Sequence, residues 1–479
     1  MGRRPELAAA RRAAGFTQEG LAEALHVART TVIRWETGEN APLPYLRPKL
    51  GRLLARSPNQ LQEIIEGAPV GGQAWPELDA AFGWLDERAG WRSGVSARKV
   101  ADWLVRPGRP VPTLAGRSRI ADTLTRYYGA NQTYRVRLDG VDVVTSIASQ
   151  SKWTDLRCRL TADTDRARVL TESPVSPLGN ILVNAAVGRL ADAATRNVRI
   201  RNAPIYCLRD VDFTEAITAK YTLAPFAEYA LTMDLMEREL GDAIELGKLG
   251  NLPLRDAYLP DMDSVFDLGG RLCAGGVVAL CAIARPADTE RGPKDYMILV
   301  QERSEHVLNA PKRLAVIPKG FHGPLVDYRA DARIGATLRR ELEEELFGRT
   351  DVDSTIGTAK AAAPMHPTRL SEPMRWLADD PDRVRVECTA FGLNLVSGNY
   401  EFASLIVIDD EEFWPRFGGH VEVNWEASGL RQYSTLDREM IAELIADESW
   451  SSEGLFALIQ GLRRLRELDP TRVRLPSGC

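Results

Sequence analysis

The chain has 479 residues, which is more than one hydrophobic core can serve, because single cores stop growing at roughly 250 to 300 residues. Hydrophobic residues make up 44% of the chain and charged residues 27%, which excludes a disordered or fibrous protein. The net charge of -5 excludes a protein that coats nucleic acid over its whole surface, so any DNA contact must come from a local basic surface.

Cysteine usage and the N-terminal sequence favour a cytoplasmic protein. The six cysteines are scattered without CxxC pairs, so neither a zinc site nor a disulfide framework is indicated. The first residues lack the apolar core of a signal peptide. The longest apolar run, residues 272–284, falls short of the ~20 residues that span a bilayer. We therefore expect no membrane anchoring.

Residues 1–68 are expected to form a compact all-α domain of five helices. Apolar residues recur there at helical spacing, and the breaks fall at glycine and proline. Thr17 can cap one of these helices, because its hydroxyl can accept an otherwise unpaired backbone N–H. Leu21 and Leu25 then face inward. This domain also carries the local excess of arginine that a DNA contact would need.

The next helix is expected to start at about Ala28 and to bury Val32 and Trp35, which lie three residues apart. Its opposite side keeps side chains that can read base edges. Arginine can donate two hydrogen bonds to guanine, and threonine offers a hydroxyl and a methyl group. The candidate DNA contacts on this side are Arg29, Thr30, Thr31 and Arg34.

The segment GFTQEGLAEALHVARTTVIRWETGENAP resembles the helix-turn-helix of the Cro/C1 repressor class, also called the Xre family. The resemblance implies that Arg29, Thr30 and Arg34 read bases and that Gln18 contacts the phosphate backbone. It also implies a double-stranded DNA operator with two half-sites, and hence a homodimer.

Two positions depart from that family pattern. His26 stands where the family usually has glycine, which predicts a strained turn, and Ala28 stands where it often has a capping serine or threonine. The alternative interpretation is a small helical bundle with solvated arginines. The joint T-Q…L-A…W-E-x-G pattern favours the DNA-binding motif.

The following segment, residues 69–116, is interpreted as a helical linker. Glycine and proline cluster at residues 67–72 and 107–112, and an amphipathic helix is expected between them at residues 75–89.

Residues 117–262 are interpreted as an α+β middle domain of unknown type. Short strands are expected at residues 134–138 and 141–147, and a longer helix at residues 224–246.

Strand patterns dominate residues 263–435, with one strongly helical segment at residues 331–347. The strands are expected at residues 276–284, 296–301, 314–317 and 388–396. Residues 436–479 are expected to hold helices at 436–446 and 454–467, followed by a tail.

The helical segment at residues 331–347 is strongly acidic. About 100° of rotation per residue puts Glu341, Glu344 and Glu345 on one edge of the helix, beside an apolar stripe. Carboxylates crowded there repel one another and lose hydration unless a cation or protons compensate. Their oxygen atoms favour Mg²⁺ or Mn²⁺. The alternative is a solvated helix in which the glutamates pair with Arg339 and Arg340.

The stretch LAVIPKGFHGPLVDYRADARIGATLRRELEEELFG resembles the Nudix hydrolase signature, G-x5-E-x7-R-E-U-x-E-E-x-G-U, where U is a bulky aliphatic residue. The resemblance implies an α/β/α Nudix-like domain whose glutamates hold divalent ions at a phosphoanhydride. It also implies that Arg340 orients these glutamates. Val326, Ala332 and Phe347 replace the early glycine, the early glutamate and the late glycine of the pattern.

A further catalytic acid is expected from a later loop, with Glu401, Glu422 and Glu426 as the candidates. His322 lies beside the predicted pocket, whereas the other histidines have no ligand-like spacing.

Together these patterns predict a DNA-binding transcription regulator whose Nudix-like domain senses a nucleotide-type small molecule. The alternative is an active Mg²⁺-dependent Nudix hydrolase of a nucleoside diphosphate derivative. In that case the helix-turn-helix serves autoregulation or localisation, and the catalytic set is Arg340, Glu341, Glu344 and Glu345. A third alternative is an interaction or defence protein that uses DNA binding to control its own expression.

Overall fold

A computed structural model describes residues 5–37, 40, 42, 46–54, 56, 61, 75–105, 115–129, 133–171, 180–196, 198, 200, 202–305, 307, 310–347, 365–418 and 427–479. The chain forms two compact units. The smaller unit consists of Met1–Pro76 with Arg92–Arg106, and the larger unit consists of Glu77–Trp91 with Pro107–Cys479.

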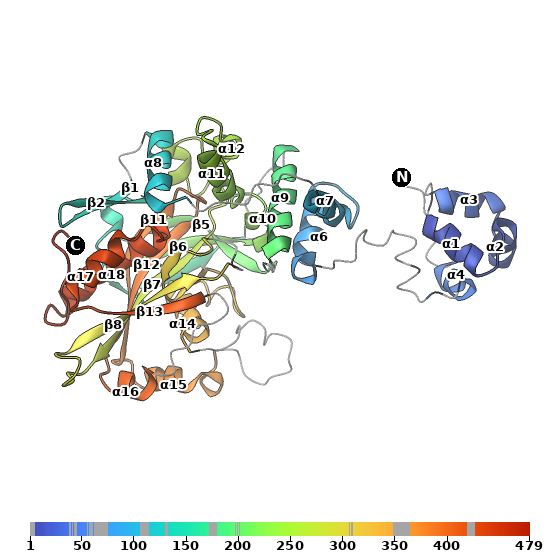
Figure 1. Cartoon of the computed structure of the whole chain (residues 1–479). Coiled ribbons are helices and arrows are strands. Elements are labelled where there is room, and N and C mark those ends of the chain that lie inside the picture. Colours follow the sequence, from blue (N-terminus) through green and yellow to red (C-terminus); the bar gives the residue numbers. More distant parts are fainter. Residues whose placement is uncertain are drawn as a thin grey trace. The chain divides into compact units, whose positions relative to one another are not determined.

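Short helices of the smaller unit enclose a core of their own (Figure 1). They are α1 (Pro5–Ala13), α2 (Gln18–Leu25), α3 (Arg29–Thr37) and α4 (Arg47–Leu53). Their apolar faces meet in a cluster that includes Leu7, Leu21 and Trp35. The fifth helix expected for this domain falls on residues 59–65, of which only Leu61 is described.

The described part of the segment interpreted as a linker contains two α-helices, which belong to different units. After the 3-10 turn η2 (Pro76–Leu78), α6 (Asp79–Arg88) confirms the helix predicted at residues 75–89 and belongs to the larger unit. The helix α7 (Val95–Leu104) was not predicted and belongs to the smaller unit.

A ten-stranded sheet is the framework of the larger unit, with the order β1-β2-β11-β12-β7-β8-β13. Strands β3, β9 and β10 pair with β11, β8 and β7. Neighbouring strands are antiparallel except β7 and β12, which are parallel. The bounds are β1 (Thr133–Leu138), β2 (Val141–Ala148), β3 (Cys158–Arg159), β7 (Gly275–Arg285), β8 (Asp295–Arg303), β9 (Leu314–Val316), β10 (Lys319–Phe321), β11 (Val384–Asn394), β12 (Tyr400–Ile408) and β13 (Ala427–Ser434).

The sheet combines strands from two segments that the sequence suggested as separate domains. The strands β1, β2 and β3 come from residues 117–262, and the others come from residues 263–435. The predicted domain boundary at residue 262 therefore does not separate two sheets, because one sheet contains strands from both sides of it.

The main core of the larger unit lies between this sheet and two C-terminal helices, α17 (Arg438–Ala446) and α18 (Ser452–Leu468). Alternate residues of β7, such as Val278 and Leu280, pack in this core with Leu458 and Ile459 of α18. The apolar side chains of α14 (Ile334–Glu345) are outside this core cluster, although α14 contacts β7 and β10.

A second, three-stranded sheet has the order β4-β6-β5, in which β4 is parallel and β5 antiparallel to β6. Its strands are β4 (Asp165–Val169), β5 (Pro204–Asp212) and β6 (Ile217–Pro225). The other described helices of the larger unit are α8 (Arg117–Tyr128), η3 (Ser151–Trp153), α9 (Asn180–Arg196), α10 (Phe226–Ala230), α11 (Leu235–Leu246), α12 (Pro253–Tyr258), α13 (Met262–Phe266), η5 (Pro367–Arg369), α15 (Glu372–Asp379) and α16 (Phe413–Phe417).

The single helix predicted at residues 224–246 is wrong. Residues up to Pro225 belong to β6, and a turn at residues 231–234 separates α10 from α11. The turn is held by Asp234, whose carboxylate is fully buried between the guanidinium group of Arg189 and the hydroxyl of Tyr229.

Within the part of the chain that the structure describes, no helix is both long and apolar enough to cross a membrane.

Candidate nucleic-acid interface and acidic helix

The two helices of the N-terminal motif have the boundaries that the sequence predicted. The Thr17 hydroxyl accepts a hydrogen bond from Gly20 N at 2.9 Å, which confirms the predicted cap of α2. At the other end of α2, His26 adopts a left-handed conformation with φ of +57°. The turn where the Cro/C1 pattern has glycine is therefore strained, because a Cβ atom disfavours this conformation.

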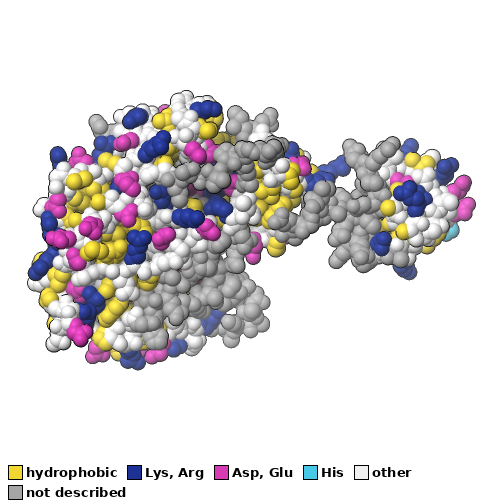
Figure 2. Space-filling view, viewed as in Figure 1, with side chains coloured by type: hydrophobic (Ala, Val, Ile, Leu, Met, Phe, Trp, Pro, Cys, Tyr) yellow, Lys and Arg dark blue, Asp and Glu magenta, His cyan; other side chains and the backbone are white. Residues whose placement is uncertain are grey.

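The helix α3 has a buried side and an exposed side. Val32 and Trp35 are buried as expected, and they fix α3 against the rest of the unit. Arg29, Thr30 and Arg34 are exposed, and Thr31, the remaining candidate on this helix, is half-buried. In Figure 2, basic side chains are scattered over the visible face of the smaller unit, with acidic side chains among them. The exposed side of α3 therefore has the residue types and the rigidity that base reading needs, while each base contact stays a prediction.

The remaining DNA-contact candidate, Gln18, is held by a hydrogen-bond network. Its Nε2 donates to Glu36 Oε2 at 2.7 Å, and Arg11 Nε donates to the other oxygen of Glu36 at 2.7 Å. Arg11 also donates to Phe16 O at 2.7 Å, so α1, α2 and α3 are joined by charge-assisted bonds. Neither Arg11 nor Glu36 was predicted to take part in this network, although Glu36 directly follows the buried Trp35.

In the larger unit, the N-terminus of the acidic helix α14 is capped from a distant part of the chain. Asp165, at the start of β4, accepts hydrogen bonds from Ile334 N at 3.2 Å and Gly335 N at 2.8 Å. Burial raises the pKa of Asp165, and the two N–H donors oppose that shift. A cap that comes from a distant part of the same chain leaves no local pattern in the sequence.

The candidate metal ligands of α14 are buried, so the alternative of a solvated helix is wrong about solvation, although the pairing of Glu341 with Arg340 that it included is present. Glu341 Oε1 accepts from Arg340 Nη2 at 3.0 Å, and Arg340 Nη1 donates to Gly323 O at 3.1 Å. Glu345 Oε2 accepts from Lys319 N at 2.6 Å. Among the described residues, no three His, Cys, Asp or Glu side chains are placed to hold one metal ion. The metal assignment to Glu341, Glu344 and Glu345 stays a prediction.

A neighbouring glutamate of the same helix has a structural role that the sequence did not suggest. Both oxygens of Glu343 accept hydrogen bonds from Ser371, one from its backbone N–H at 2.7 Å and one from its hydroxyl at 2.6 Å. Ser371 in turn caps α15 by accepting from Met374 N. Glu343 therefore ties α14 to α15.

A buried charged network continues from Lys319 toward α18. The Lys319 ammonium pairs with Glu453, and Asn394 Nδ2 donates to Glu453 Oε2 at 3.1 Å. Burial raises the pKa of Glu401 to about 8, with repulsion from Glu453 adding to the shift. Burial alone would raise the pKa of Glu453 as well, but the adjacent Lys319 lowers it. Of the three late acids that the sequence proposed, Glu401 belongs to this network, and Glu422 and Glu426 lie outside the described residues.

His322 is a core residue. Its side chain is fully buried, and its Nδ1 lies 3.1 Å from the hydroxyl of Tyr400. That hydroxyl donates to Tyr206 O at 3.2 Å, so the imidazole is the donor to Tyr400. Burial, with the charge of Arg340 nearby, lowers the pKa of His322 to about 3, which keeps the ring neutral.

The three positions that depart from the Nudix pattern have different surroundings. Ala332 is fully buried just before α14, and Val326 is exposed on the preceding loop. The ring of Phe347 packs against that of Phe413, with the ring centroids 6.2 Å apart.

Comparison with known proteins identifies the class of the N-terminal module. Residues 7–46 match the helix-turn-helix family model, which confirms the Cro/C1-type motif and supports a DNA-binding regulator. No curated protein matches the chain.

Proposed function

We propose that this chain is a transcription regulator that reads double-stranded DNA with α3. The observation that carries the proposal is the exposed side of α3, where Arg29, Thr30 and Arg34 project from a helix whose other side is fixed by Val32 and Trp35. The match of residues 7–46 to the helix-turn-helix model supports it. Gln18 stands at the first turn of α2, where unpaired backbone N–H groups favour a phosphate.

The test begins with selection of bound sequences from a random DNA library by the full-length chain. Arg29→Ala should cost roughly 1 to 3 kcal/mol and relax the preference at one base position, because arginine reads guanine through two hydrogen bonds. Gln18→Ala should weaken binding more evenly across sequences. Arg431→Ala, which removes an exposed arginine of β13 in the larger unit, serves as the matched control. Unchanged affinity and selectivity in both Arg29→Ala and Gln18→Ala would sink the proposal.

A homodimer is part of this proposal, because one helix-turn-helix offers few base contacts and two half-sites about one helical turn apart require two copies. Selected sequences should therefore be palindromic. Sedimentation of the complex should give two chains per operator, and a single chain on a single half-site would contradict this part.

We further propose that the larger unit contains a Nudix-like domain that senses a nucleotide-type molecule. The support is the packing of β10 on α14: a Cβ atom at Gly320 would lie 2.2 Å from the carboxylate carbon of Glu341. The strand β10 and the acidic helix are thus fitted closely to each other. Ala332 and Phe347, which replace the early glutamate and the late glycine of the pattern, favour ligand binding over hydrolysis.

The second candidate is an active hydrolase, favoured by Glu401, whose pKa of about 8 suits proton transfer near neutral pH. For this function, Mg²⁺ or Mn²⁺ would be held by Glu341, Glu344 and Glu345 and would supply charge stabilisation at a phosphoanhydride. Because Ala332 replaces the early glutamate of the pattern, this site has one acidic residue fewer than the resemblance requires, and sensing is the preferred proposal.

Both candidates are tested on the full chain with a panel of nucleoside diphosphate derivatives, with and without Mg²⁺. A sensor should show a thermal shift without turnover, and the ligand should change DNA affinity. Hydrolysis that disappears in Glu344→Gln and Glu345→Gln, with DNA binding intact, would replace the sensor by the enzyme. Absence of both binding and turnover would reject the Nudix-like assignment and leave the DNA proposal untouched.

A further inference from the structure

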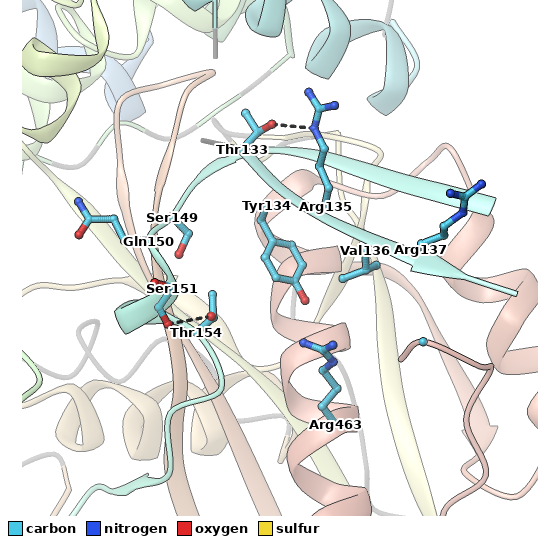
Figure 3. A pocket seen from close by; sticks show the side chains of 11 residues that line it. Thr133, Tyr134, Arg135, Val136, Arg137, Ser149, Gln150, Ser151, Thr154 and Arg463 are labelled. Atoms are coloured by element: carbon cyan, nitrogen blue, oxygen red, sulfur yellow. Dashed lines mark hydrogen bonds between the residues drawn. The ribbon is translucent and has the colours of Figure 1, made fainter. Parts of the chain in front are cut away.

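A groove of about 530 Å³ lies in the larger unit, between β1, the turn after β2 and the helix α18 (Figure 3). It belongs neither to the DNA-reading surface nor to α14. The described residues that line it contribute hydroxyl groups and arginines but no aspartate or glutamate. The residues are Thr133, Tyr134, Arg135, Val136, Arg137, Ser149, Gln150, Ser151, Thr154, Arg463 and Gly478.

Tyr134 presents a hydrogen-bond donor to this groove. Its ring is fixed edge-on against Phe456 with the centroids 4.7 Å apart, and its oxygen accepts from Gln460 Nε2 at 3.0 Å. Burial raises the pKa of Tyr134, so the hydroxyl keeps its proton at physiological pH. Because the oxygen already accepts one bond, its own hydrogen is available to a ligand.

Arg463 presents a positive charge beside that hydroxyl, and Figure 3 shows the two groups pointing toward each other. Arg463 Nη1 pairs with Asp155 at 3.1 Å, but the side chain of Asp155 is 55% exposed, so water weakens the pair. The pair uses one nitrogen. In the part of the chain that the structure describes, no hydrogen bond engages Nε or Nη2 of Arg463 or the hydroxyl of Ser151.

The surrounding strand adds positive potential. Arg135 and Arg137 project from the side of β1 opposite to Tyr134, as alternation along a strand requires (Figure 3). Among the described residues, the partners of the Arg135 guanidinium are the hydroxyls of Thr133 and Thr125. The pair of Arg137 with Asp142 is 3.6 Å long and exposed on both sides, which makes it weak.

We propose that this groove binds a phosphate monoester of metabolite size. A terminal phosphate offers three acceptor oxygens and about two negative charges, which match the guanidinium nitrogens of Arg463 and the hydroxyls of Tyr134 and Ser151. A volume of about 530 Å³ exceeds what the phosphate alone fills and lies within the range of small-molecule sites. The organic part of the ligand rests on Val136 and the ring of Tyr134.

The test titrates the full chain with inorganic phosphate and with phenyl phosphate, followed by calorimetry and phosphorus NMR. Phenyl phosphate should bind more tightly than inorganic phosphate. Arg463→Gln should weaken binding at least fivefold and Tyr134→Phe two- to fivefold, while the control Arg431→Gln should leave it unchanged. Glu344→Gln should also leave it unchanged, which separates this groove from α14.

One variant is expected to gain affinity. Asp155→Asn removes the carboxylate that competes for Arg463, and asparagine tolerates the left-handed backbone at this position, where φ is +52°. Tighter binding by Asp155→Asn separates a ligand role of Arg463 from a structural one. No binding by the parent chain, equal binding by folded Arg463→Gln, or loss of binding in Glu344→Gln would each overturn the proposal.

Discussion

His26 closes α2 in a conformation that a side chain opposes, with φ of +57°. Its backbone N–H still completes the helix by donating to Ala22 O and Glu23 O, so the turn keeps its geometry while carrying strain. The sequence predicted this strain from a single position, because glycine is the residue that the motif normally uses there. The conformation of this residue could be predicted because the Cro/C1 resemblance placed a glycine position there, and a Cβ atom disfavours the left-handed conformation.

His26→Gly should stabilise the smaller unit by about 1 kcal/mol, because glycine adopts this conformation without steric cost. Hydrogen exchange of the amides of α2 and α3 in the full chain measures the effect. His26→Ala is the matched control: it removes the imidazole but keeps the Cβ atom, so it should give no such gain. Equal stabilisation by both variants would mean that the imidazole, not the backbone, carries the cost.

Glu401 should make the larger unit less stable as the pH rises from about 4.5 toward 8. Its pKa is raised to about 8 in the fold, so the native state keeps a proton that the unfolded chain releases near its ordinary pKa of 4.5. The stabilisation is complete below 4.5 and is lost as the pH passes the native pKa, at up to ~1.4 kcal/mol per pH unit.

Urea unfolding at pH 5.5 and pH 7.5 measures this dependence. Glu401→Gln should flatten the slope, since the amide cannot titrate. Glu439→Gln, at an exposed position of α17, should not change it. A parent chain whose stability rises over this interval, with the same slope in Glu401→Gln, would contradict the assignment.

Elements with their own periodicity could be predicted, and elements that depend on distant partners could not. The strands β1, β2, β7 and β8 and the helices α14, α17 and α18 match the predicted ranges closely, because alternation and helical spacing are local signals. The single helix predicted at residues 224–246 is wrong, because the turn held by the buried Asp234 and its bond to Arg189 divides it. In the same way, α14 was predicted but its cap at Asp165 was not.

Asp165→Ala should destabilise the larger unit by about 2 kcal/mol, because it leaves the buried N–H groups of Ile334 and Gly335 without their acceptor. Thermal unfolding and hydrogen exchange of α14 measure the loss. Asp163→Ala, two residues earlier and exposed, is the control. If α14 exchanges at the parent rate in Asp165→Ala, the cap contributes no stability.

At the scale of the whole molecule, the two units are built on separate cores. The cluster around Leu21 and Trp35 shares no residue with the cluster between the large sheet and α18. The candidate sites follow the same division. The surface of α3 could be predicted because its motif is contiguous, whereas the groove beside β1 could not, because its lining comes from four separate stretches of chain.

Separate cores predict separate unfolding. Leu21→Ala should weaken the smaller unit by about 3 kcal/mol through a cavity in its core, and DNA binding should fall with it. Hydrogen exchange of β12 should stay at the parent rate. Leu405→Ala, in the core of the larger unit, should give the reverse pattern. Parallel loss of protection in both units from either variant would show one cooperative structure.

The position of α18 has a consequence for biosynthesis. This helix contacts β2, β11, β12, β7 and β9, so that face of the sheet stays uncovered on the ribosome until residues 452–468 have emerged. The helix-turn-helix, by contrast, needs only the first stretch of chain. A nascent or prematurely terminated chain would therefore carry a folded DNA-reading module beside an open, aggregation-prone sheet. Premature stop codons upstream of α18 are thus expected to lower the solubility of the product before they alter its operator preference.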